Sequence, residues 1–87
     1  MKFKTHKIFD KQYAKLRLKE QKRVDEALKL FLTTPNNRKL RNHALRGEWE
    51  GFFSISAGGD LRIHYKILEN NSLLFVAAVG THAQLYE

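Results

Sequence analysis

The stretch from residue 61 to residue 67 constrains the fold most, because its apolar and polar side chains alternate without a break. The apolar positions are Leu61, Ile63, Tyr65 and Ile67, and the polar ones are Arg62, His64 and Lys66. Successive side chains of a strand point to opposite faces, so this period of two predicts a strand with one buried and one polar face. By the same parity Asp60 belongs to the polar face. We expect that face to be open and to carry a site.

Two more strands are expected on either side of this one. Residues 51–56 come before it and are joined to it through Ala57-Gly58-Gly59, whose glycine pair suits the positive φ of a hairpin turn. Residues 69–72 form another turn, and residues 73–79 are apolar throughout, as is typical of a central strand covered on both faces. The second half of the chain therefore predicts a three-stranded meander.

The first half has a helical period instead. Apolar residues recur with the spacing of amphipathic helices at Phe9, Tyr13, Leu16, Val24, Ala27, Leu28 and Phe31. We expect helices over about residues 8–18 and 19–33, the second ended by the turn residues around Pro35. A polar linker should follow to about Gly47, and residues 2–6 should form an edge strand. The order β–α–α–β–β–β predicts an α+β fold, with two N-terminal helices packed on one face of a small, mainly antiparallel sheet.

Length and composition limit the class of protein. The 87 residues predict a single domain over residues 1–87, because two cores of half this size would rarely fold alone. The absence of cysteine excludes disulfides and thiolate metal sites. The first residues do not resemble a signal peptide, and no apolar run is long enough to span a membrane, so we expect a cytoplasmic protein that does not bind membranes.

The positive charge is concentrated in one half of the chain. Residues 1–46 carry 14 Lys/Arg and 4 Asp/Glu, whereas residues 47–87 carry 2 and 5. Such a basic half attracts polyanions, with nucleic acid as the commonest partner and an acidic protein as the next. The alternative is a charged helix surface that only keeps the protein soluble.

Three segments, in order, carry a resemblance to a known family. They are residues 42–51 (NHALRGEWEG), 59–66 (GDLRIHYK) and 80–86 (GTHAQLY). Together they resemble the YafQ branch of the RelE/ParE toxin superfamily. The resemblance implies a RelE-like fold and the toxin of a type II toxin–antitoxin system. It also implies an endoribonuclease that cleaves mRNA, in many members on the ribosome, without a metal or other cofactor.

The implied reaction is attack of a ribose 2′-hydroxyl on the neighbouring phosphorus, which needs a proton acceptor, a proton donor and fixed positive charge. His82 matches the family's Gly-Thr-His block and is assigned as general acid; otherwise it begins a C-terminal helical turn and makes a local hydrogen bond. His43 matches the His-x-Leu-x-Gly block and would assist proton transfer or hold the phosphate, unless it is a plain loop histidine. Asp60 would act as base or orient a histidine, unless it is only a turn residue.

Four residues are candidates for binding RNA. Arg62 departs from the YafQ pattern but matches an arginine of RelE that binds the scissile phosphate, a task suited to a guanidinium. Tyr86 stands where the family has an aromatic residue near the carboxyl end, able to stack on a base or hydrogen-bond to phosphate, although its ring could also pack on the sheet. Lys66 and His64 are further electrostatic candidates. Trp49, Gly47 and Gly51 also match, but we interpret them as a buried anchor and two backbone positions with unusual dihedrals.

Departures from the family pattern leave other functions open. Ser56 and Ala78 replace a histidine and an arginine, and Leu61 replaces a tryptophan, so we expect Arg62 to supply the lost charge. The alternatives are a ParE-like inhibitor that binds DNA gyrase without catalysis, and a degraded toxin that binds only antitoxin or operator DNA. The histidines and Asp60 favour the enzyme, since a pure binder needs no proton-transfer groups. Its partners would be mRNA, ribosomal RNA and an antitoxin with an acidic or amphipathic segment.

Overall fold

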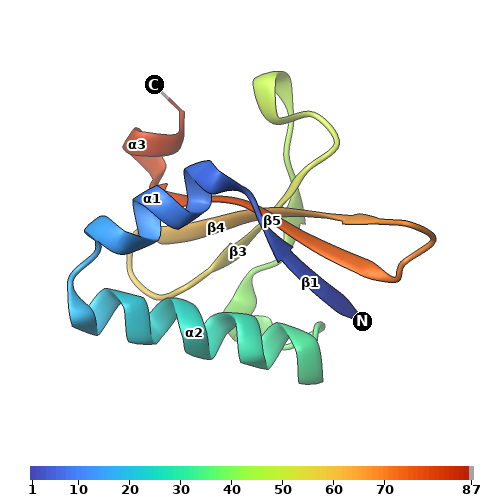
Figure 1. The fold of residues 1–87 in the computed structure, drawn as a ribbon, viewed down its shortest axis with the longest axis horizontal. Coiled ribbons are helices and arrows are strands. Elements are labelled where there is room, and N and C mark those ends of the chain that lie inside the picture. Colours follow the sequence, from blue (N-terminus) through green and yellow to red (C-terminus); the bar gives the residue numbers. More distant parts are fainter. Residues whose placement is uncertain (87) are drawn as a thin grey trace.

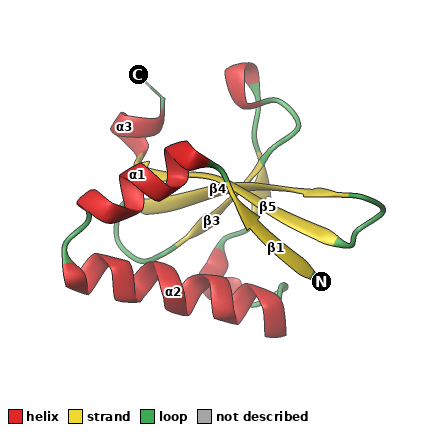
Figure 2. Cartoon of the chain, viewed as in Figure 1, coloured by secondary structure: helices red, strands yellow, loops and turns green. Residues whose placement is uncertain are grey.

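The computed structural model describes residues 1–86 and shows one sheet with helices on both sides (Figures 1 and 2). Its strands lie in the order β1-β5-β4-β3-β2, with β1 parallel to β5 and all other pairs antiparallel. The elements along the chain are β1 (Lys2–Thr5), α1 (Lys7–Lys15), α2 (Leu18–Thr33), the 3₁₀ turn η1 (Arg38–Leu40), β2 (His43–Ala44), the 3₁₀ turn η2 (Gly47–Trp49), β3 (Phe53–Ser56), β4 (Leu61–Leu68), β5 (Leu73–Thr81) and α3 (His82–Leu85).

The predicted α+β class, the meander β3-β4-β5 and the edge position of β1 are confirmed. Helices α1 and α2 both bury apolar residues in one core against the sheet. The apolar side chains predicted for β4, from Leu61 to Tyr65, belong to the same core. The rings of Phe31 and Tyr65 meet there with centroids 4.8 Å apart. The period-two interpretation of residues 61–67 therefore placed the buried face correctly. No helix among residues 1–86 combines the length and apolar character that crossing a membrane requires.

The prediction that the segment before Gly47 is only a polar linker is wrong, because it contains two buried leucines and a short strand. Leu40 and Leu45 are only 1% and 6% exposed, and between them β2 pairs with β3. Two leucines separated by polar residues give neither a period of two nor one of 3.6, so the pattern carried no signal for these anchors. They hold the segment that carries His43 against the sheet.

Helix α1 runs beside the part of β5 that extends beyond its partner β1. The β1–β5 pairing ends at Val76, and farther along the strand the backbone N–H of Val79 donates to Oε1 of Gln12 at 2.8 Å. Gln12 thus takes the place of a missing strand. Helices α1 and α2 are joined by a second polar contact, in which the Tyr13 hydroxyl donates to Oδ1 of Asp25 at 2.7 Å.

Replacing Gln12 by leucine is expected to lower the free energy of unfolding by about 1–3 kcal/mol, because the buried N–H of Val79 loses its acceptor. Chemical denaturation would measure the loss. Gln12→Glu keeps an acceptor oxygen and is the matched control, expected to retain most of the stability. Equal stability of the leucine variant and the wild type would contradict the assigned role.

Candidate active site

A row of four residues crosses the sheet on the face away from α2. In the strand register His43 lies opposite Ser54, Ser54 opposite His64, and His64 opposite Ala78. Residues directly opposite each other in antiparallel strands project from the same face, so two histidines share this face with a buried serine between them. The sheet register thus brings together segments that are far apart in the sequence.

His64 is covered, which corrects the expectation of an open polar face. Its parity with Arg62 and Lys66 holds, but its side chain is 0% exposed. Trp49 packs edge-on against the imidazole with ring centroids 4.4 Å apart, and Tyr86 lies 5.5 Å from it. Strand alternation predicts the face of a residue but not which distant segments cover it. The expectation that this face is open is therefore wrong at His64, whereas an electrostatic role of His64 toward RNA stays a prediction.

The surroundings of His64 keep its imidazole neutral. Burial, together with the smaller effect of the charges of His43 and His82, lowers its pKa from 6.5 to about 4. Neither ring nitrogen has a hydrogen-bond partner among residues 1–86. Since His43 and His82 both act on it electrostatically, these three imidazoles belong to one cluster.

His82 and Tyr86 are set by the short helix α3. Thr81 caps this helix: its Oγ1 accepts from the N–H of Gln84 at 3.3 Å, and its own N–H donates to Oε1 of Gln84 at 2.8 Å. A Cβ at Gly80 would lie 2.9 Å from that Oε1, so a side chain at this position would have to displace the Gln84 amide that completes the cap. His82 is the first helical residue and is exposed, and its ring lies 4.6 Å from that of Tyr86. Burial raises the pKa of Tyr86, whose side chain is still 40% exposed.

His43 is exposed and has a fixed tautomer. Its Nδ1 lies 2.9 Å from the backbone oxygen of Arg41. A carbonyl oxygen only accepts, so Nδ1 carries the hydrogen and donates, and Nε2 of the neutral ring holds a lone pair. The position offers a proton acceptor at the edge of the sheet. Nothing in the sequence pattern indicated this contact, because it depends on the left-handed conformation of Arg41, with φ of 48°.

Asp60 and Arg62 lie at the β3–β4 hairpin. Leu61 pairs with Thr81, so Asp60 before it and His82 after Thr81 stand at neighbouring ends of β4 and β5. Asp60 is exposed. Nη1 of Arg62 donates to the backbone oxygens of Gly59 at 2.8 Å and Leu61 at 3.2 Å, with Oγ of Ser56 at 3.5 Å. The guanidinium is therefore anchored at the turn, where the predicted positive φ of both glycines is confirmed.

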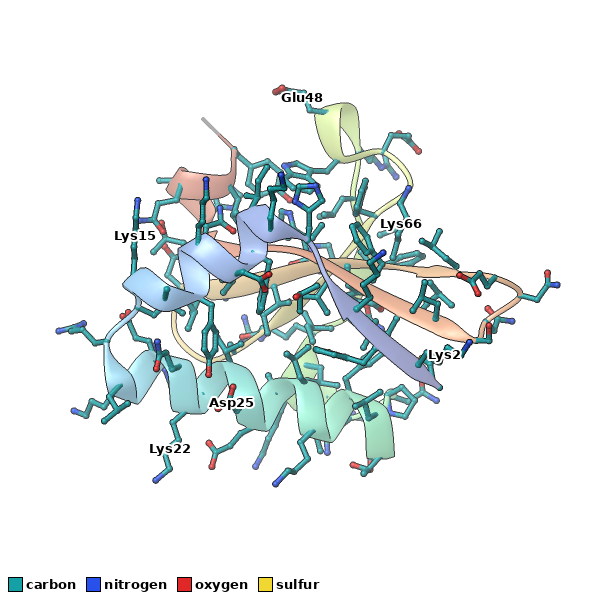
Figure 3. All side chains as sticks on the ribbon, in the orientation of Figure 1. Lys2, Lys15, Lys22, Asp25, Glu48 and Lys66 are labelled. Carbon is teal, nitrogen blue, oxygen red and sulfur yellow. The ribbon has the colours of Figure 1, made fainter. Side chains whose placement is uncertain are left out.

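Lys66 and Trp49 complete this face. The Lys66 Nζ lies 4.4 Å from the centroid of the Phe52 ring, a cation–π contact away from His82. Trp49 is half-buried rather than fully buried, and its Nε1 donates to the backbone oxygen of Leu85 at 3.0 Å, which ties its loop to α3. Figure 3 shows Glu48 at the tip of that loop, on the side of the sheet opposite Lys22 and Asp25 of α2.

The cluster therefore has two exposed imidazoles, His43 and His82, on either side of the buried His64, with Tyr86 between His64 and His82. Such an arrangement can take one proton and give another. Among residues 1–86, no three His, Asp or Glu side chains are grouped in a way that could hold a metal ion. Sequence reasoning missed Ser54 and the carbonyl of Leu85, whose roles depend only on tertiary contacts.

The chain was compared with known proteins. It matches over residues 1–87 the family model described as the bacterial toxin of a type II toxin–antitoxin system, YafQ. Among curated proteins no match was found. The fold is similar to that of YafQ from E. coli strain BL21(DE3), with 22% identity, a TM-score of 0.80 and coverage of 98% of this chain and 97% of that one.

Two further solved structures are similar. One is the E. coli DinJ-YafQ complex, with 25% identity, a TM-score of 0.79 and coverage of 98% and 97%. The other is a metal-bound toxin from Helicobacter pylori, with 26% identity, a TM-score of 0.72 and coverage of 99% of both chains. The RelE-like fold implied by the resemblance is confirmed, and the chain belongs to the YafQ family of type II toxin–antitoxin toxins.

Proposed function

We propose that this toxin is an endoribonuclease that cleaves mRNA, on the ribosome, by attack of a ribose 2′-hydroxyl on the adjacent phosphate. The observation that supports this most is the pair of exposed imidazoles, His43 and His82, gathered around one buried neutral histidine. Acid–base catalysis of phosphodiester cleavage needs two such groups near neutral pH. A protein that acts only by binding has no use for them.

In this mechanism Nε2 of His43 takes the proton of the 2′-hydroxyl, and the oxygen attacks phosphorus. The bond from phosphorus to the 5′ oxygen breaks, and His82 gives its proton to that leaving oxygen. The products are a 2′,3′-cyclic phosphate and a free 5′-hydroxyl. The hydrogen bond from Nδ1 of His43 to Arg41 favours His43 over Asp60 as the base, because it directs the lone pair away from the loop. Asp60, next to the start of α3, would orient His82.

The remaining candidates would hold the RNA. Arg62, anchored at the hairpin, would provide positive charge to the pentavalent transition state in place of the family residues replaced by Ser56 and Ala78. Tyr86 has enough exposed ring surface to stack on a base. Lys66 would contact the strand farther along the face. We also propose that an antitoxin restrains this toxin, as the DinJ-YafQ complex suggests by analogy.

Induced expression in a bacterium tests this proposal, with the 5′ ends of cellular mRNA mapped before and after induction. We expect growth arrest together with new ends carrying a 5′-hydroxyl, in register with codons. Arrest without RNA cleavage would contradict the proposal and favour a ParE-like inhibitor of gyrase. Absence of arrest would favour a degraded toxin.

A further inference from the structure

A large cleft lies around the sheet edge from the histidine cluster. It has a volume of about 620 Å³ and is bounded by α2, η1 and the β3–β4 hairpin. Figure 1 shows these three segments next to one another, on the side of the sheet where α2 lies. Its walls carry three cations, Arg23, Lys39 and Arg41, and one carboxylate, Glu26, all of them exposed.

None of the three cations forms an ion pair among residues 1–86. Among residues 1–86 the one ion pair joins Arg17 to Glu20, outside the cleft. Arg23 lies along the hairpin turn, since a Cβ at Gly58 would be 3.4 Å from its Cδ. Lys39 and Arg41 come from a different part of the chain, at and just after η1. Cations brought to one cleft from separate elements create a site for a polyanion.

Two residues that line the cleft also have partners in the proposed active site. Strand β2 pairs only with Phe53 and Ser54, so the edge of β3 at Ser56 has no strand partner on that side, and Ser56 lines the cleft. Across β3, Ser56 is the register partner of Arg62. The second residue is Arg41. Its backbone carbonyl accepts the hydrogen bond from the His43 ring, and the residue itself lines the cleft.

We propose that this cleft is a binding subsite for the sugar-phosphate backbone of single-stranded RNA, next to the phosphate that is cleaved. The inference rests on the proposed ribonuclease function and extends it. An RNA chain with its reactive phosphate between His43 and His82 must continue past one side of the sheet, and the edge at Ser56 leads it to three cations. An acidic protein segment would match the charge but has no reason to follow a path that begins at the catalytic histidines, so RNA is the better-supported ligand.

Binding of uncleavable 2′-O-methyl RNA tests the proposal directly. With an oligomer of about 12 nucleotides, long enough to pass beyond the active site, Arg23→Ala is expected to weaken binding about threefold to fivefold, as for one partly exposed charge contact. The slope of log affinity against log salt should become shallower by about 0.7. Glu26→Gln should tighten binding. Lys22→Ala is the matched control, because Lys22 neighbours Arg23 but points away from the sheet (Figure 3).

The length of the RNA gives a second measurement. The loss caused by Arg23→Ala should be larger for the long oligomer than for a dinucleotide, which cannot reach the cleft. Equal losses for Arg23→Ala and Lys22→Ala would overturn the proposal and leave only general charge attraction. Unchanged RNA affinity with weakened antitoxin binding would overturn it in favour of a protein-docking surface. The RNA probe cannot be cleaved, so its binding is measured separately from cleavage. If the protein binds the probe as expected but never cleaves mRNA, the proposed function is contradicted and the proposed subsite is not.

Discussion

Replacing His82 by alanine is expected to lower the rate of RNA cleavage by about 100-fold or more, the range for losing a general acid. The exposed imidazole stands at the first position of α3, so its loss removes the proton donor for the leaving 5′ oxygen and little packing. The helix keeps its cap, which depends on Thr81 and Gln84. Cleavage of a labelled mRNA by the purified toxin, with ribosomes present, would measure the effect.

Two controls separate chemistry from folding in this experiment. The thermal unfolding midpoint of His82→Ala should stay close to that of the wild type, and free imidazole in the buffer should restore part of the cleavage rate. Lys22→Ala, on the opposite side of the sheet, should cleave like the wild type. If His82→Ala cut RNA at the normal rate, His82 would have no part in the reaction, and Asp60 would be the next candidate for the acid.

The long elements were predictable because each repeats its pattern several times. Strand β4 shows its two faces over eight residues, and α2 repeats its apolar stripe over sixteen. Three elements had no prediction of their own: β2 has two residues, and η1 and η2 have three each, too few to display any period. Their positions depend on tertiary contacts, such as the burial of Leu45 and the hydrogen bond from Trp49 to Leu85.

The site shows the same division. The sequence predicted which residue types would matter, because their chemistry is local, and strand parity put His64 on the correct face. It could not show that His64 is covered, since the covering rings of Trp49 and Tyr86 come from segments on either side of the strand in the sequence. Nor could it show that Arg62 is held by the backbone of its own hairpin. Spacing predicts direction, whereas burial depends on the complete fold.

Folding stability is expected to fall steeply as the pH drops from about 7 to about 4, because His64 is buried in its neutral form. Its pKa in the folded protein is about 4, below the ordinary value of 6.5 that applies when the chain is unfolded. Between these values the unfolded chain binds the proton and the folded one does not, so the stabilisation is complete above pH 6.5 and is lost as the pH falls. The shift corresponds to on the order of 3 kcal/mol.

The variant His64→Phe isolates this contribution, because it removes the titrating group and retains a ring between Trp49 and Tyr86. Denaturant titrations from pH 7 to pH 4 should show a clearly smaller loss of stability in the variant than in the wild type. At pH 7 the variant should be at least as stable, because the imidazole nitrogens it removes have no hydrogen-bond partner among residues 1–86. His43 and His82, which also face this position, are exposed and remain in both proteins. An identical pH dependence in the two proteins would mean that the carboxylates, and not His64, govern acid unfolding.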